Sequence, residues 1–419
     1  MELLHSTIRS AGPLRVDLRH IIYALTDALD LVGIDDVGHG KRVGIMALSC
    51  ADQLGFTLEE SAFIFNLGML HDIGVSSTVV HNHLVTEFDW TGSQAHCEIG
   101  CDLLRQFEPL QSMALPIFYH HTRWDVLKNL PQIDAKTAMY ANLIFMVDRV
   151  DALAAAYPSG QLLMNINRIR EQIRSHADTY FSPSLVQVFL DVSSSEAFWL
   201  QLEARNLQII QREMLEKTAP VFTSLTELKA IGLIFAHIVD AKSPFTAEHS
   251  IGVAKLSRLI AEQMGVQTEN CDKIEIAGLL HDLGKLRIPD EVLDKPGALN
   301  ERERLVINAH SFETFQILRQ IEGFEEIAEW AACHHEELAG DGYPFRIKAS
   351  ELPIEARILR VADIFQAMAQ TRPYRKGLSA QEVLAFLNKL VAEGRIEPKI
   401  VDAFSGNMPL AMKTALSIS

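Results

Sequence analysis

Histidine and aspartate side chains recur in this sequence in an order that suits the binding of metal ions. Seven of them in the second half of the chain form one set: His249, His281, Asp282, His310, His334, His335 and Asp363. Imidazole and carboxylate groups suit iron, manganese or zinc and are poorly suited to copper(I) or calcium. Seven such groups exceed the needs of one ion, so the set predicts two ions, with Asp282 able to give one oxygen to each. Two ions can activate a water as a nucleophile and bear the charge of a phosphoryl oxygen.

The same set of residue types occurs once before in the chain. Its members are His39, His71, Asp72, His96, His120, His121 and Asp148. His39 and His71 precede their counterparts by 210 residues, and Asp148 precedes Asp363 by 215 residues. Ten of the sixteen histidines fall at these fourteen positions. This internal repeat opposes the alternative that each histidine is an isolated core or surface residue.

Helices are the elements that must position these residues. Val253, Leu256, Ile260 and Met264 recur at helical spacing before Gly265, which predicts an amphipathic helix that ends at the glycine. Residues 39–55 repeat this pattern, and no segment shows a strand-like alternation. The sequence therefore predicts an all-α fold built from two similar helical domains.

The run of serines at 193–195 suggests a boundary or a helix N-cap, and a strong helix-forming segment follows it. We expect a first domain over 1–195, a linker over 196–224 with a connecting helix at 196–217, and a second domain over 225–419.

Composition restricts the class of protein. The net charge of −16 argues against a protein that coats a polymeric nucleic acid. No apolar run is long enough to predict a membrane span or a signal peptide. Five cysteines without a CxxC pair favour reduced thiols, so a cytoplasmic location is expected.

Two strings carry a resemblance to a known family. HDLGK at 281–285 resembles the signature of the HD phosphohydrolase superfamily, and HHEELAGDGYP at 334–344 matches the HHExxxGxGYP pattern of its HD-GYP subgroup. RPYRKG at 372–377 is also similar to that family. The resemblance covers roughly residues 235–390. It implies tandem HD-type helical domains, of which the second hydrolyses cyclic dinucleotides with two metal ions, iron or manganese foremost and zinc or nickel as alternatives.

The resemblance also implies roles for individual residues. One ion would be held by His249, His281, Asp282 and Asp363. The other would be held by Asp282, His310, His334 and His335. Asp282 and Lys285 would be catalytic, because a lysine beside the cluster can stabilise charge that develops on a phosphate.

Substrate contacts are implied for Lys285, Gly342, Tyr343, Arg372 and Arg375. An arginine can make forked contacts to phosphate or to a guanine edge, but Arg375 could equally form a surface salt bridge. Tyr343 could instead have a structural role in its loop. Some family members bind a third ion through a Glu at the position of Phe245, so its absence here favours two ions.

The first repeat lacks the parts that would bind substrate. Val75 stands at the position of Lys285, and Lys128, Asn129 and Leu130 stand where the second half has Gly342, Tyr343 and Pro344. We expect the first domain to be an HD-like domain that retains a metal site but has no phosphodiesterase activity. A regulatory or dimerising role is predicted, which leaves a homodimer open, and a purely structural duplicate is the alternative.

The leading functional hypothesis is hydrolysis of cyclic di-GMP to the linear dinucleotide pGpG in second-messenger signalling. A preference for 3',3'-cyclic GMP-AMP is the alternative within the same class. Two further alternatives are a non-catalytic signalling adaptor, which the intact ligand set and Lys285 oppose, and hydrolysis of dNTPs or (p)ppGpp, which the complete GYP motif opposes.

Overall fold

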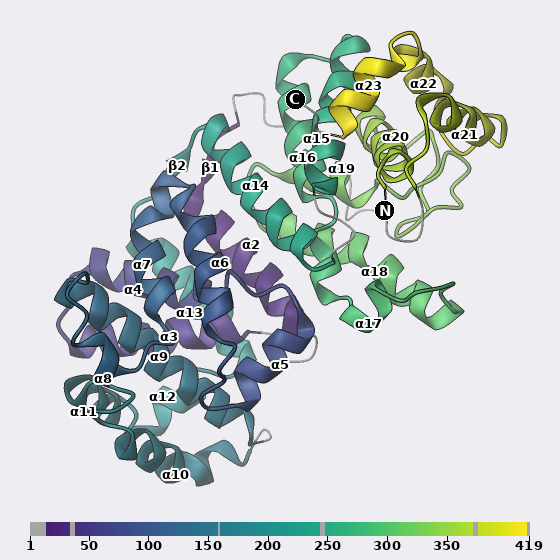
Figure 1. Cartoon of the computed structure of the whole chain (residues 1–419). Coiled ribbons are helices and arrows are strands. Elements are labelled where there is room, and N and C mark those ends of the chain that lie inside the picture. The colour runs from purple at the N-terminus through teal and green to yellow at the C-terminus, as the bar shows by residue number, and fades with distance from the viewer. Residues whose placement is uncertain (1–13, 34–37, 158–159, 244–247, 372–375, 417–419) are drawn as a thin grey trace. The chain divides into compact units, whose positions relative to one another are not determined.

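Helices dominate the structure, a computed structural model that describes residues 14–33, 38–157, 160–243, 248–371 and 376–416 (Figure 1). Strands β1 (Val16–Asp17) and β2 (Phe222–Thr223) form a short antiparallel ribbon in which Val16 pairs with Thr223. The expected all-α fold is confirmed.

The chain divides into two units at places that differ from the expected boundaries. The N-terminal unit is Leu25–Val221, and the C-terminal unit combines the segment up to Ala24 with Phe222–Ser419. The boundary at 24/25 falls inside helix α2 (Leu18–Asp30). No sequence pattern signals this division, because the strands that join the two parts of the C-terminal unit are only two residues long.

The C-terminal unit is built from helices that follow β2. They are α14 (Leu225–Ala241), α15 (His249–Gln263), α16 (Thr268–Leu280), η3 (Leu283–Arg287), α17 (Asp290–Leu293), α18 (Glu301–Leu318), α19 (Glu325–Ala332), α20 (Ile354–Ala369), α21 (Ala380–Ala392), α22 (Pro398–Ser405) and α23 (Met408–Ala415). Helix α15 packs along both α16 and α20. Buried apolar residues such as Val253, Leu256 and Ile260 form the inner face of α15, as the periodicity predicted.

The N-terminal unit is also helical. Its elements after α2 are η1 (Leu31–Gly33), α3 (His39–Gln53), α4 (Leu58–Leu70), α5 (Thr78–Thr86), α6 (Gln94–Arg105), η2 (Glu108–Met113), α7 (Ala114–Tyr119), α8 (Trp124–Leu127), α9 (Ala135–Ala155), α10 (Leu162–Ser175), α11 (Pro183–Val192), α12 (Glu196–Leu200) and α13 (Ala204–Lys217). Helices α3 and α4 pack together as α15 and α16 do, and α3 also packs on α9.

The prediction of a single connecting helix at 196–217 is wrong. The structure has two helices there, α12 and α13, and both belong to the N-terminal unit. Leu207 and Met214 are buried, and Gln201 Nε2 donates to Ser49 Oγ of α3 at 3.1 Å. The segment therefore packs on its own unit, because its apolar face needs a partner. Ser195 does act as the predicted N-cap, accepting from Ala197 N at 3.1 Å.

Helix α18 shows how local sequence fixes an element that carries a site residue. Asn300 Oδ1 accepts from Glu303 N at 2.9 Å, and the Glu303 carboxylate accepts from Asn300 N at 2.8 Å. This capping box satisfies backbone groups that would otherwise lack partners, so the helix begins at Glu301.

All five cysteines are free and buried. Among the described residues, no helix combines the length and apolarity needed to cross a membrane.

Candidate metal centre

The C-terminal unit brings together the seven residues of the second set. They come from the start of α15, the end of α16, the middle of α18, the end of α19 and α20: His249, His281, Asp282, His310, His334, His335 and Asp363. Several three-residue groups among them have ligand atoms that all lie within 4.8 Å of one another. Such spacing suits shared metal ions.

Asp282 lies between two halves of this cluster. Its Oδ2 is 3.3 Å from His281 Nε2 and 3.6 Å from His249 Nε2. Its Oδ1 is 3.4 Å from His310 Nε2 and 3.8 Å from His334 Nε2. One carboxylate oxygen therefore faces each half, which is the arrangement that a bridging carboxylate needs.

Three histidines of the cluster are held in one orientation by backbone carbonyls. His281 Nδ1 lies 2.7 Å from Gly278 O, His310 Nδ1 lies 2.7 Å from Ile307 O, and His334 Nδ1 lies 2.6 Å from Ala331 O. Because a carbonyl only accepts, each Nδ1 must donate its proton. In the neutral ring, Nε2 then presents a lone pair to the cluster, as a metal ligand must.

The charge states of the cluster also suit cations. Burial acts to raise the pKa of Asp363, but the hydrogen bond and charge of His249 outweigh it and hold the pKa below its usual range. Burial likewise opposes ionisation of Asp282, yet the charges of His281 and Lys285 hold its pKa well below normal. Burial lowers the pKa of His310 to about 4. At neutral pH these groups are two carboxylates and a neutral imidazole, the forms that bind metals.

Two buried atoms of the cluster have no hydrogen-bond partner among the residues that the structure describes. They are Asp282 Oδ1 and His281 Nε2. Leaving such atoms unsatisfied costs about 1–3 kcal/mol each. A cation between them would remove this cost, so the residues present fit a metal centre.

Gly284 allows the turn after Asp282 to approach the next helix. A Cβ at this position would clash with the backbone carbonyl of His310. Gly74 meets the carbonyl of His96 in the same way in the N-terminal unit. The glycine of each HDxG string therefore permits the contact that brings the HD pair to the following histidine.

Lys285 lies on η3, beside Asp282. Its Nζ is 2.5 Å from Asp282 Oδ2, and its side chain is 20% exposed. The ammonium group therefore reaches both the cluster and solvent, where an anionic ligand would arrive.

The loop after His335 is held by a buried carboxylate. Glu336 Oε1 accepts from Phe345 N at 2.7 Å and from Arg346 N at 3.0 Å. This folds the loop back so that the Tyr343 ring lies 4.7 Å from the His335 ring, centre to centre. Tyr343 thus lies against His335, at the edge of the histidine and aspartate cluster.

Gly342→Ala is expected to lower both stability and turnover. A Cβ at Gly342 would lie 2.5 Å from His335 O, Glu336 Cα and Glu337 N, all of which are backbone atoms with little freedom to move. We expect the free energy of unfolding in urea to fall by about 1–3 kcal/mol. The matched control is Gly406→Ala, because a Cβ there meets no atom within 4 Å. Equal stability and activity of both variants would contradict the packing described.

The N-terminal unit assembles the seven residues of the first set in a similar way. Asp72 Oδ2 is 3.6 Å from His71 Nε2 and 3.7 Å from His39 Nε2, while Asp72 Oδ1 is 3.2 Å from His96 Nε2 and 4.0 Å from His120 Nε2. The remaining pair also meets, with His121 Nε2 at 3.8 Å from Asp148 Oδ2.

Protonation differs among these histidines. Burial lowers the pKa of His120 and His121 well below the usual value. Burial also opposes protonation of His96, but Cys97 and Asp72 raise its pKa to about 10. Burial is again outweighed at His39, where Asp151 raises the pKa to about 9. A metal ion would have to displace protons from His39 and His96.

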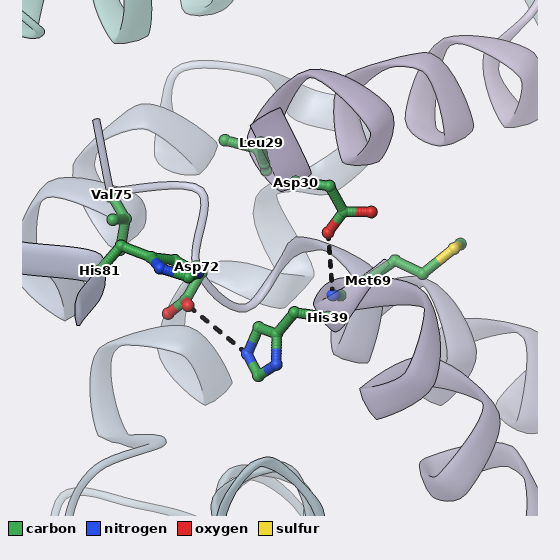
Figure 2. A pocket seen from close by; sticks show the side chains of 8 residues that line it. Leu29, Asp30, His39, Met69, Asp72, Val75 and His81 are labelled. Carbon is green, nitrogen blue, oxygen red and sulfur yellow. Dashed lines mark hydrogen bonds and ion pairs between the residues drawn. The ribbon is translucent and has the colours of Figure 1, made fainter. Parts of the chain in front are cut away.

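Figure 2 shows a cavity beside His39 and Asp72 in the N-terminal unit. Its volume is about 20 Å³, and Val75 lines it at the position where the second repeat has Lys285. This volume holds about one water molecule. Val75 offers no cation to a phosphate, unlike the lysine at the corresponding position of the second repeat.

Comparison with known proteins agrees with this geometry. A family model described as an HD domain matches residues 211–400. Over 399 residues the chain is 36% identical to the 3'3'-cGAMP-specific phosphodiesterase 1 of Vibrio cholerae, a match that spans 94% of this chain and 92% of that enzyme. The chain belongs to the HD-GYP family of cyclic-dinucleotide phosphodiesterases. Enzymes of this family depend on metal ions.

Two other matches refine the comparison. The chain is also 38% identical over 171 residues to the cyclic di-GMP phosphodiesterase response regulator RpfG of Xanthomonas campestris, a match that covers 40% of this chain and 45% of that protein. The crystal structure of the cyclic GMP-AMP specific phosphodiesterase V-cGAP3 of V. cholerae has a similar fold, with a TM-score of 0.64 and 24% identity over 97% of this chain and 99% of that one.

Three residues of interest in this HD-GYP protein lie outside the described residues. They are Phe245, Arg372 and Arg375. Their expected roles stay predictions. The HD family model covers 211–400, so the expectation that the N-terminal unit is a degenerate HD domain also stays a prediction.

Sequence reasoning missed the residues that hold the first histidine of each set. His249 Nδ1 lies 2.5 Å from Gln366 Oε1, and His39 Nδ1 lies 2.8 Å from Asp151 Oδ2. Gln366 and Asp151 each follow the aspartate of their set by three residues on the same helix. That spacing places each of them on the same helical face as the aspartate of its set, and it could have revealed them.

Proposed function

We propose that the C-terminal unit hydrolyses 3',3'-cyclic GMP-AMP to a linear dinucleotide. The match to the V. cholerae enzyme of that specificity supports this substrate, because it extends over both units of the chain. The match to the cyclic di-GMP enzyme is confined to 40% of the chain. The order of the two substrates expected from sequence alone is therefore reversed, and cyclic di-GMP becomes the second candidate.

Two divalent ions, iron or manganese, are proposed as cofactors of this unit. One would be held by His249, His281, Asp282 and Asp363. The other would be held by Asp282, His310, His334 and His335. When bound, the pair supplies an activated water and Lewis acidity toward the phosphodiester.

The protein's own groups orient the reaction. The backbone carbonyls behind His281, His310 and His334 fix their rings, so the ligand atoms need not reorganise. Lys285 Nζ lies beside Asp282 Oδ2 and would donate to a non-bridging oxygen as negative charge grows there. Water adds to phosphorus, the bond to one 3' oxygen breaks, and that oxygen gains a proton, which leaves a linear product with a 5'-phosphate.

Substrate preference can be measured with the full chain loaded with Mn²⁺ or Fe²⁺. We expect kcat/KM for 3',3'-cyclic GMP-AMP to exceed that for cyclic di-GMP by about tenfold or more, which corresponds to roughly 1.4 kcal/mol. Mass analysis should identify a linear dinucleotide. A reversed ratio would assign the enzyme to cyclic di-GMP, and no hydrolysis of either would refute the proposed activity.

A further inference from the structure

We propose that the N-terminal unit binds one divalent transition-metal ion in a closed site formed by Asp72, His96, His120 and His121. This ion would stabilise the fold rather than take part in hydrolysis. The proposal does not depend on which substrate the C-terminal unit cleaves.

The four ligand atoms are already close enough for one ion. They all lie within 4.8 Å of one another. His96 Nε2 is 3.2 Å from His120 Nε2 and 3.2 Å from Asp72 Oδ1. Ligands about 2.0–2.1 Å from a tetrahedral Zn²⁺ lie roughly 3.3 Å apart. These two spacings match this value, while Asp72 Oδ1 and His120 Nε2, at 4.0 Å, would have to move closer together.

The orientation of these groups also suits a ligand role. His120 Nδ1 lies 2.6 Å from Ile117 O and must donate to it, so Nε2 of the neutral ring offers its lone pair to the cluster. Asp72 Oδ1 is buried and, within the described part of the chain, has no hydrogen-bond partner. A metal ion would satisfy both atoms at once.

A larger group of ligand atoms already converges at this site than in the C-terminal unit. Here four protein groups converge, whereas each convergent group in the C-terminal unit has three members. Structural zinc sites have four protein ligands, while catalytic sites leave a position open for water or substrate. Four ligand atoms already gathered within 4.8 Å of one another suit one tetrahedral ion with no position left for water or substrate.

Two arginine side chains donate to carboxylates on the His39 side of the N-terminal cluster. Arg149 is buried and its Nη2 donates to Asp148 Oδ2 at 2.8 Å, while Arg42 Nη2 donates to Asp151 Oδ2 at 2.8 Å. The positions that correspond to Arg149 and Arg42 in the second repeat are an isoleucine and a glycine. These guanidinium groups neutralise the acids nearest His39, so a second ion has weaker ligands there. One ion is therefore expected instead of two.

The decisive experiment empties the catalytic centre and leaves the N-terminal unit unchanged. A full-length His281→Ala/Asp282→Ala/His334→Ala variant breaks every convergent group of the catalytic centre. After dialysis against a defined concentration of Zn²⁺, it is expected to retain one equivalent of zinc per chain by mass spectrometry of metals. Retention of none would overturn the proposal, and retention of two would overturn the single-ion assignment. Because this variant cannot hydrolyse substrate, the result is independent of the proposed function.

Two further measurements test the ligands. Cobalt(II) bound to the same variant should show the strong visible absorption of a tetrahedral ion, and the weak absorption of a six-coordinate ion would contradict a closed site. Adding His120→Ala should remove the remaining equivalent and lower the melting temperature. The matched control is His83→Ala, because His83 lies in the same unit but is 46% exposed and paired with Glu87, and it should keep the ion. Loss of zinc in both variants would contradict the assignment of His120.

Discussion

Replacing Asp282 with alanine is expected to abolish hydrolysis and to remove metal from the C-terminal unit. Asp282 gives one oxygen to the side of His249 and His281 and the other to the side of His310 and His334. Loss of a side chain that merely contacts a metal ligand already lowers metal affinity or activity about 10–100-fold. Loss of a carboxylate that serves both halves must cost more, and turnover should fall to the background rate.

The measurement pairs turnover of the cyclic dinucleotide with metal content per chain. Asp402→Ala is a suitable control, because Asp402 is an exposed aspartate on α22, away from the cluster in sequence. Asp282→Asn tests charge separately from shape, since the amide keeps one oxygen but loses the negative charge. Turnover near that of the unmodified protein in Asp282→Ala would refute the assignment of Asp282 as the shared ligand.

Replacing Lys285 with alanine is expected to slow hydrolysis by on the order of 100-fold while metal content stays unchanged. Removal of one preorganised donor to a developing oxyanion has an effect of this size. Lys285 has no role as a ligand, because an ammonium group offers no lone pair. The loss should therefore appear in kcat at saturating substrate.

The control for Lys285 lies two residues further along. Arg287 is on the same short helix and forms an ion pair with Glu313, so Arg287→Ala removes a positive charge without reaching the cluster. It should retain most of the activity. If Lys285→Ala lost its metal ions together with its rate, the lysine would be a structural support of the cluster rather than a donor to substrate.

The repeat in the sequence predicted the two clusters of histidine and aspartate residues. The metal-binding residue types and the apolar periodicity of the helices both indicated the same segments. Each pair of histidine and aspartate lies at a helix end, and the seven members of each set meet as expected. Gln366 and Asp151 were missed, since their role depends on a side chain brought near by folding rather than on their own sequence pattern.

The segment 196–217 shows a different limit. Its composition predicted one helix, but the chain turns between Leu200 and Ala204 without a glycine or a proline to signal it. Packing of Leu207 and Met214 against the N-terminal unit decides the path of the chain there. Tertiary contacts of this kind override local propensity.

The ribbon of β1 and β2 has a consequence for how the protein is made. Thr223 Oγ1 donates to Val16 O at 2.9 Å, across a separation of 207 residues. The N-terminal unit is thus an insertion within the C-terminal one, and the ribosome produces the first strand of the ribbon long before its partner. During synthesis the inserted unit can fold first, while the nascent strand around Val16 waits unpaired. A fragment that begins at residue 225 would lack both strands, so a shortened enzyme should keep the β1 segment and replace the insertion with a short loop.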